Sequence, residues 1–230
     1  MKWAVIVFPG SNCDEDAANA IRDVTGDTCD LVWHDATDLN QYDAIVLPGG
    51  FSYGDYLRGG AIARFSPVME AVKKEAANGK LILGICNGFQ VLTESHLLSG
   101  ALLRNDHLQF RCEMTELVVE NNTSPFTMDY QIGERIRIPI AHGEGRYVTD
   151  STQLADLEKT SRIAFRYAAN PNGSIEDIAG VISPSNTILG LMPHPERAVT
   201  EFMGSEDGRR LFLSMHRYVE EGAHLATANR

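Results

Sequence analysis

A cysteine set between glycines at the end of an apolar run is the clearest chemical signal in this sequence. The apolar residues 81–85 lead into Gly84-Ile-Cys86-Asn-Gly88, and a helical pattern starts at once. At such a tight strand-to-helix turn a nucleophile stands above the sheet, and the flanking glycines avoid collisions with the turn. The N-terminus of the helix also favours a thiolate over a thiol. Cys86 is therefore predicted to be a nucleophile, with a buried structural cysteine as the alternative.

A nucleophilic cysteine needs a group that carries protons and a second group that orients the first. Pro193-His194-Pro195-Glu196 supplies both just after an apolar, strand-like segment, where the functional residues of α/β folds collect. His194 and Glu196 are two positions apart, so extended backbone would place both side chains on one side. We expect His194 to act as base and then acid, and Glu196 to orient its imidazole. A surface histidine beside an unrelated glutamate is the alternative.

Acyl chemistry also needs hydrogen-bond donors for the oxyanion that develops during the reaction. Leu47-Pro48-Gly49-Gly50 ends a predicted strand with two glycines, whose peptide N–H groups can stay exposed. The N–H groups of Gly50 and of Asn87, the residue after the nucleophile, are the predicted oxyanion hole. An ordinary glycine turn is the alternative.

The elements that must position these residues alternate between strand and helix in the first half of the chain. Apolar runs separated by helical patterns indicate a parallel sheet covered on both faces. The predicted strands cover 3–8, 28–33, 43–47 and 80–85, and the predicted helices cover 14–24, 62–77 and 87–98. The second half predicts partly exposed, antiparallel strands at 111–120, 135–140 and 163–167, a strand pair at 178–183 and 187–192, and a last helix at 206–221. We therefore expect one α/β domain over residues 1–230, with a mostly parallel sheet and an antiparallel extension.

Composition excludes several classes of protein. The 230 residues carry 20 basic and 31 acidic side chains, a net charge of −11, which argues against nucleic acid or an anionic membrane as the main partner. The apolar runs are too short to cross a bilayer, and the first one is typical of a strand rather than of a signal peptide, so we expect a cytoplasmic protein. Four cysteines without a CxxC pair predict neither a zinc site nor a disulfide framework. We expect no metal, and we expect Cys13, Cys29 and Cys112 to be small buried hydrophobic residues.

Five motifs together resemble those of the class I, or triad, glutamine amidotransferases. Within that family, the chain is most similar to the stand-alone glutaminase subunits of phosphoribosylformylglycinamidine synthase, an enzyme of purine biosynthesis. The motifs are Phe-Pro-Gly-Ser-Asn-Cys-Asp at 8–14, Pro-Gly-Gly-Phe-Ser-Tyr-Gly-Asp-Tyr-Leu-Arg at 48–58, Gly-Ile-Cys-Asn-Gly at 84–88, Ala-His-Gly-Glu-Gly-Arg-Tyr at 141–147 and Pro-His-Pro-Glu-Arg at 193–197. The family fold is a flavodoxin-like α/β domain, which agrees with the alternation of strands and helices.

The resemblance implies a reaction and a role for each matching residue. Cys86 would attack the side-chain amide of glutamine and form a glutamyl thioester, with His194 moving the protons and Glu196 orienting His194. Ammonia and glutamate would be the products. The residues that match the family's glutamine-binding positions are Gln90, His142, Gly143 and Glu144.

The resemblance also implies partners. A phosphate-binding Walker A loop would need Gly-x4-Gly-Lys-Ser/Thr, and the only Gly-Lys pair, Gly79-Lys80, does not fit that pattern. We therefore expect no cofactor on this chain, and expect ATP and magnesium on a separate synthetase subunit that receives the ammonia. The family adds a small third subunit in many bacteria.

Two other functions remain open from the residues alone. One is a different flavodoxin-like cysteine hydrolase, such as a peptidase-like or glyoxalase-like protein. The other is a non-catalytic binding module on the same fold, in which Cys86 has no chemical role.

Overall fold

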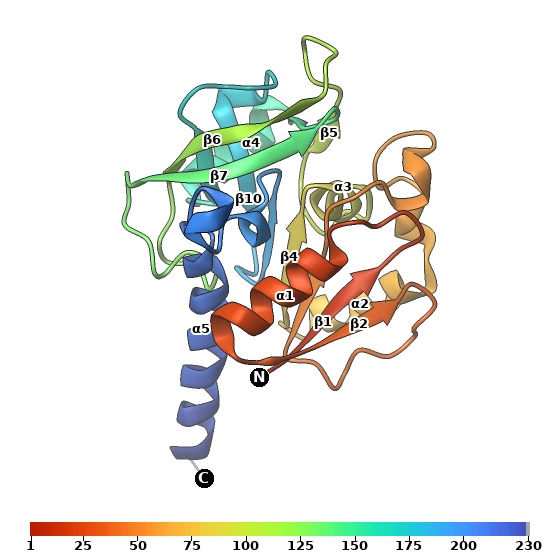
Figure 1. Ribbon diagram of the computed structural model, residues 1–230, viewed down its shortest axis with the longest axis vertical. Helices are drawn as coiled ribbons and strands as arrows, with labels where there is room; N and C mark the ends of the chain where they lie inside the picture. The colour runs from red at the N-terminus through yellow and green to blue at the C-terminus, as the bar shows by residue number, and fades with distance from the viewer. Residues whose placement is uncertain (229–230) are drawn as a thin grey trace.

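A nine-stranded mixed sheet forms the centre of the protein (Figure 1). The computed structural model describes residues 1–228, with residues 223–228 described by their backbone alone. The strand order is β2-β1-β3-β4-β11-β10-β9-β6-β7, and a separate pair joins β5 to β8. The strands are β1 (Lys2–Val7), β2 (Thr28–Trp33), β3 (Ala44–Leu47), β4 (Leu81–Ile85), β5 (Ala101–Leu103), β6 (Arg111–Val119), β7 (Arg135–His142), β8 (Arg146–Val148), β9 (Ile163–Tyr167), β10 (Ile178–Ile182) and β11 (Ile188–Leu191). The expected α/β fold class is confirmed.

Helices cover both faces of the parallel half of the sheet. In Figure 1, α1 (Asp14–Thr25) crosses in front of the parallel strands, α5 (Arg209–Ala228) runs beside them at the left and packs against α1, and α2 (Pro67–Ala77) and α3 (Asn87–Glu94) lie behind the strands. Every residue of β3 and β4 is buried, as a strand must be when both of its faces are covered. This is why these two strands have continuous apolar sequences instead of alternating ones.

The antiparallel half of the sheet differs from the parallel half in its exposure. Strand β7 alternates strictly between outward and buried residues along most of its length, and β6 does so along its second half, because one face of this hairpin packs inward and the other meets solvent. The sequence missed three short elements in this region: β5, β8 and α4 (Ser151–Lys159). Asp150 begins α4 by accepting a hydrogen bond from the Gln153 N–H at 2.9 Å, a helix-start signal that was readable in the sequence.

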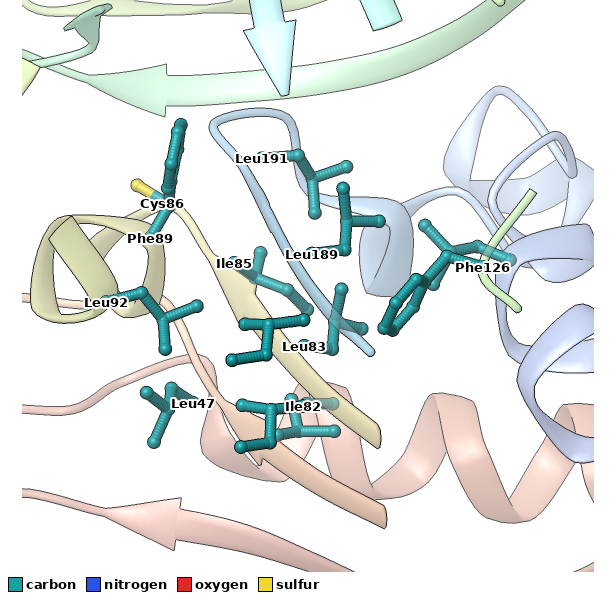
Figure 2. Packing of buried hydrophobic residues seen from close by; sticks show 14 of the residues in the cluster. Leu47, Ile82, Leu83, Ile85, Cys86, Phe89, Leu92, Phe126, Leu189 and Leu191 are labelled. Carbon is teal, nitrogen blue, oxygen red and sulfur yellow. The ribbon is translucent and has the colours of Figure 1, made fainter. Parts of the chain in front are cut away.

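One crossover decides where the chemistry takes place. Strand β11 pairs with β4 in parallel, with Leu191 opposite Ile85, although it comes about a hundred residues later in the chain. The chain leaving β11 therefore emerges beside the turn that leaves β4. Figure 2 shows the packed core under this edge, with Ile82, Leu83, Leu189 and Leu191 stacked together and Cys86 at its upper end, where β4 meets α3.

The predicted helices differ from the observed ones at three places. The helix expected at 62–77 is split, because Ser66 precedes Pro67 and takes an extended conformation with ψ 144°, the conformation that a following proline favours. The helix expected at 87–98 ends at Glu94, and His96 turns away from it with a φ of 59°. The last helix begins at Arg209 instead of 206, because the Gly208 N–H donates to Ala198 O and holds the preceding residues in a loop. This helix also continues past 221 to Ala228.

The cysteine prediction holds for two residues and is wrong for one. Cys13 and Cys29 are buried, whereas Cys112 is exposed. It lies on β6 opposite Ala141 of β7. No helix within residues 1–228 is long and apolar enough to cross a membrane. That residues 1–230 form a single domain stays a prediction, and residues 229–230 lie outside the described part.

Candidate active site

Cys86 occupies a strained turn between β4 and α3. Its φ of 50° and ψ of −104° are unusual for a residue with a side chain, and such strain persists only where the surroundings enforce it. The Cys86 N–H donates to Leu191 O at 2.8 Å, which ties the turn to β11. Gly88 must be glycine, because a Cβ there would overlap the carbonyl oxygen of Leu47. The turn has the geometry of a nucleophile elbow.

His194 and Glu196 form a buried hydrogen-bonded pair. His194 Nδ1 lies 2.6 Å from Glu196 Oε1, and the two residues are only 2% and 1% exposed. The expected extended backbone is wrong at this place. Pro195–Arg197 form a single 3-10 turn, and this turn brings the Glu196 carboxylate back to the imidazole. Among the described residues, none makes a hydrogen bond to His194 Nε2.

The charge on His194 follows from these contacts. Burial by itself lowers its pKa, but Glu196 and then Cys86 raise it, and the pKa lies well above the usual value for histidine. This shift favours the imidazolium form of His194, the form that can donate a proton. Cys86 Sγ points toward Ala141 O, 3.7 Å away, on the β7 segment that crosses the site.

Gly49 forms the surface on which the His194 ring lies. A Cβ at Gly49 would lie 2.7 Å from His194 Cε1 and 3.2 Å from Cys13 Sγ, both too close for ordinary packing. The predicted oxyanion segment therefore approaches His194, a member of the predicted triad of Cys86, His194 and Glu196. The next part of the segment approaches the elbow, because the Ser52 N–H donates to Asn87 Oδ1 at 3.2 Å. The assignment of the Gly50 and Asn87 N–H groups as an oxyanion hole stays a prediction.

The predicted glutamine-binding residues meet on the α3 side of Cys86. Gln90 Nε2 donates to Glu144 O at 2.7 Å, and Gln90 Oε1 accepts from Asn87 Nδ2 at 2.8 Å. Glu144 Oε2 accepts from the Gly59 N–H at 3.1 Å. These bonds join α3, the loop after β3 and the turn after β7 into one wall. The role of that wall in binding glutamine stays a prediction.

His142 and Gly143, the two residues before Glu144, make contacts outside this wall. His142 is buried, and a Cβ at Gly145 would overlap its imidazole. Burial first, and then the positive charge of His194, lower the pKa of His142 to about 4, so it is neutral at pH 7. Gly143 O accepts from the Asn105 N–H at 3.0 Å. Their predicted contacts with substrate also stay predictions.

Asp55 is a residue of this wall that the sequence analysis did not single out. Its Oδ1 accepts from Asn87 Nδ2 at 3.2 Å. Burial, and next the charge of Glu144, raise its pKa to about 6, against a smaller lowering by the Asn87 hydrogen bond. Asp55 lies inside the quoted 48–58 motif, so its place in that motif was the available signal.

Cys13 and Arg197 were also missed as neighbours of the triad. One possible ligand atom from each of Cys13, His194 and Glu196 lies within 4.8 Å of the other two, a grouping that a metal ion can use. Arg197 Nη2 donates to Cys13 Sγ at 3.2 Å and to Asp16 Oδ2 at 2.9 Å. These contacts join the guanidinium, the sulfur and the His194–Glu196 pair into one polar cluster. That the chain holds no metal stays a prediction. Cys13 follows β1, and the carboxyl end of a strand was the signal for it.

Residues 1–219 match the family of CobB/CobQ-like glutamine amidotransferase domains. A chain of PurLQS from Thermotoga maritima is similar at 49% identity, with a TM-score of 0.88 over 95% of this chain and 98% of that one. The chain belongs to the glutamine amidotransferase family. The resemblance expected from the five motifs is thereby confirmed.

Two more distantly related structures share only their fold with this chain. A putative GMP synthase protein from Thermoplasma acidophilum is 18% identical, with a TM-score of 0.67 over 99% of this chain and 98% of that one. The glutaminase domain of Trypanosoma brucei CTPS, solved with bound acivicin, is 16% identical, with a TM-score of 0.62 over 96% and 94% of the two chains. The flavodoxin-like glutaminase fold is therefore confirmed for this member of the family.

Proposed function

We propose that this chain is the glutaminase subunit of phosphoribosylformylglycinamidine synthase. The observation that carries the proposal is the cysteine elbow at Cys86, set beside a buried His194–Glu196 pair with a bond of 2.6 Å. Family membership and the similarity to a chain of PurLQS support the same function. The product ammonia would convert formylglycinamide ribonucleotide to formylglycinamidine ribonucleotide on a partner.

The chemistry follows from the positions of the three side chains. The Cys86 thiolate adds to the side-chain amide carbon of glutamine, and the carbonyl oxygen becomes an oxyanion that peptide N–H groups stabilise. His194 gives its Nε2 proton to the amide nitrogen, the C–N bond breaks, and NH3 leaves a glutamyl thioester. Neutral His194 then takes a proton from water, whose oxygen attacks the thioester. Glutamate leaves, and Cys86 and protonated His194 are restored.

Glu196 has a positioning role in this scheme. Its hydrogen bond to Nδ1 leaves Nε2 as the nitrogen free to act toward Cys86, and it would stabilise the imidazolium that donates the proton. Gln90 and Glu144 would form the wall against which the amino-acid end of glutamine lies. Gly50 and Asn87 would supply the oxyanion donors, and His142 and Gly143 would complete the pocket.

The second half of the reaction belongs to other subunits. Making an amidine from an amide needs ATP, so the proposal places ATP and magnesium on a synthetase subunit, with no cofactor on this chain. A small third subunit in the complex and a cytoplasmic location are further parts of the proposal. The family resemblance supports them.

A labelling experiment tests the nucleophile and the substrate class together. A diazo-ketone analogue of glutamine is added to the complex with its synthetase, and the adducts are mapped by mass spectrometry. We expect an adduct on Cys86, which is 5% exposed, but not on the exposed Cys112, and we expect excess glutamine to prevent it. Labelling of Cys112 instead, or of neither residue, would favour a non-catalytic binding module.

A variant then tests whether the two half-reactions take place on different subunits. Cys86→Ala should abolish amidine synthesis from glutamine and leave synthesis from ammonium chloride intact. Cys29→Ala is the matched control, since burial raises the pKa of that thiol to about 11 and leaves it unreactive. If Cys86→Ala also stops ammonia-dependent synthesis, the split between the two subunits is wrong.

A further inference from the structure

The turn that follows β7 runs from the nucleophile to the predicted glutamine-binding wall. At its start, Ala141 O lies 3.7 Å from Cys86 Sγ, and further along Glu144 O accepts from Gln90 Nε2 at 2.7 Å. Residues 143–145 lie after the end of β7 and before the start of β8. Because they belong to neither strand, other groups must satisfy the backbone of this part of the site.

Asn105 holds this turn with three hydrogen bonds. It lies in the loop between β5 and β6, and its side chain is fully buried. Its Nδ2 donates to His142 O and its Oδ1 accepts from the Gly145 N–H, both at 3.0 Å. Its own N–H donates to Gly143 O, also at 3.0 Å. One residue thus satisfies a donor and two acceptors of the turn, as a neighbouring strand would.

Asn172 holds the same turn from a second loop, which joins β9 to β10. This side chain is 1% exposed, and its Nδ2 donates to Gly145 O at 2.9 Å. The same nitrogen lies 3.4 Å from His142 Nε2. Asn172 O accepts from the Asp106 N–H at 3.1 Å, so the two loops are bonded to each other as well as to the turn. Asn105 and Asn172 together form what we call the asparagine clamp.

The position of the turn sets the orientation of another side-chain amide. Gln90 can point its nitrogen at Glu144 O only while that carbonyl stays in place, and its Oε1 then faces Asn87 Nδ2 at 2.8 Å. A turn that moved would leave the Gln90 amide without this partner. The asparagine clamp therefore acts on the wall beside Cys86 through Glu144 and Gln90.

Resting on the proposed function, we propose that Asn105 and Asn172 are positioning residues for glutamine, which fix the turn so that the Glu144 carbonyl already faces Gln90 before the substrate binds. Both asparagines act through the turn and not on the reacting atoms. A binding group that is fixed in advance needs no ordering when the ligand arrives. Loss of the clamp should therefore weaken glutamine binding more than it slows the chemistry.

Two isosteric substitutions test the clamp. A carboxylate only accepts hydrogen bonds, so Asn172→Asp sets an oxygen against Gly145 O but still accepts from the Ser174 N–H and Oγ. Asn105→Asp does the same against His142 O. In the complete complex, we expect either variant to raise KM for glutamine about tenfold and to leave kcat within about threefold of wild type.

Asn121→Asp is the matched control. Asn121 is another buried asparagine that holds a turn, since its Nδ2 donates to Ser161 O at 2.7 Å and its Oδ1 accepts from the Ser124 N–H at 3.0 Å. That turn follows β6 and is separate from residues 142–145. The control should lower the thermal transition as the clamp variants do, and it should keep the wild-type KM.

A comparison of two labels separates positioning from a general loss of structure. The diazo-ketone analogue must occupy the glutamine site before it modifies Cys86, whereas iodoacetamide needs only the reactive sulfur. In the clamp variants the ratio of the two labelling rates should fall about tenfold, because only the first depends on the wall. Asn121→Asp should keep the ratio of the wild type. A merely structural role of the asparagines would change both rates alike.

Several results would overturn the clamp. They are a KM within twofold of wild type in both variants, a kcat that falls at constant KM, and an unchanged labelling ratio. If a variant does not fold, hydrogen exchange in the wild-type complex decides: the Gly145 N–H should exchange slowly before glutamine is added. Exchange that becomes slow only with the analogue bound would mean that the substrate orders the turn. A wild-type Cys86 that reacts with iodoacetamide but not with the diazo-ketone would instead refute the proposed function.

Discussion

Replacing Gly49 with alanine should disable the triad without removing any of its members. The added Cβ would lie 2.7 Å from His194 Cε1, whereas ordinary contact begins near 3.4 Å. Because Glu196 holds Nδ1, the ring atom bonded to Cε1, at 2.6 Å, the ring can retreat by about 0.7 Å only by distorting or breaking that bond. A displacement of about 1 Å at a reacting group costs roughly 100-fold in rate. We therefore expect kcat for glutamine hydrolysis to fall between about 10- and 100-fold.

The assay uses the complete complex, with glutamate release measured against synthesis from ammonium chloride. Only the first should fall, because the second does not use His194. Gly222→Ala is the matched control: a Cβ there meets nothing within 4 Å. It should leave activity unchanged and add about 0.5–1 kcal/mol to the free energy of unfolding, since alanine is the better helix former.

The steric reasoning would be refuted by a Gly49→Ala variant whose kcat stays within twofold of wild type. A variant that instead lost both reactions along with its thermal transition would show a folding defect. A histidine NMR spectrum distinguishes a displaced His194 from an undisturbed one.

Three further results are expected. Glu196→Gln should lower the pKa of His194, seen by NMR, and reduce kcat on the order of 100-fold or more. The pKa of His142 is lowered to about 4, so the unfolded chain takes up this proton at a higher pH than the folded protein does. The free energy of unfolding should therefore fall by about 3 kcal/mol as the pH falls from 6.5 to 4. Denaturant titrations at several pH values measure this loss. Glu144→Gln should bring the pKa of Asp55 down from about 6, measured by carboxyl NMR.

Each of these has a result that contradicts it. An unchanged pKa of His194 in Glu196→Gln would mean that the carboxylate does not set the charge of the imidazole. His142→Asn should flatten the loss of stability below pH 6.5, and the same slope in that variant would assign it to other groups. If Asp55 keeps its pKa in Glu144→Gln, burial alone accounts for the shift.

The local elements were largely predictable because their signals are local. Continuous apolar runs followed by glycine identified β3 and β4, and the boundaries of β2 and β9 agree with the prediction. The helix prediction over 62–77 failed at a single residue, since periodicity does not record that Pro67 forces Ser66 out of the helical conformation. The short strands β5 and β8 were missed because three residues are too few to show a period.

The residue types of the site were also readable, but their contacts were not. Cys86 and the His194–Glu196 pair stood out by type and spacing, and the five motifs indicated the family. The reason that His194 and Glu196 meet was misjudged: a 3-10 turn joins them, not an extended strand. Cys13, taken for an ordinary buried residue, lies beside the triad because the loop after β1 runs next to the loop after β3, where Gly49 O accepts from the Cys13 N–H.

The sequence by itself determined the alternation of elements, the elbow and the chemistry that Cys86 and His194 can perform, since each depends on neighbours within a few residues. Only the tertiary structure decided that β11 lies beside β4, which places His194 near a cysteine more than a hundred residues earlier. It alone buried both His142 and His194, and their pKa values move in opposite directions: burial, and then the charge of His194, lower that of His142, whereas Glu196 outweighs burial and raises that of His194. Burial and charge at a site sum over all neighbours in space, and most of those neighbours are distant in the chain.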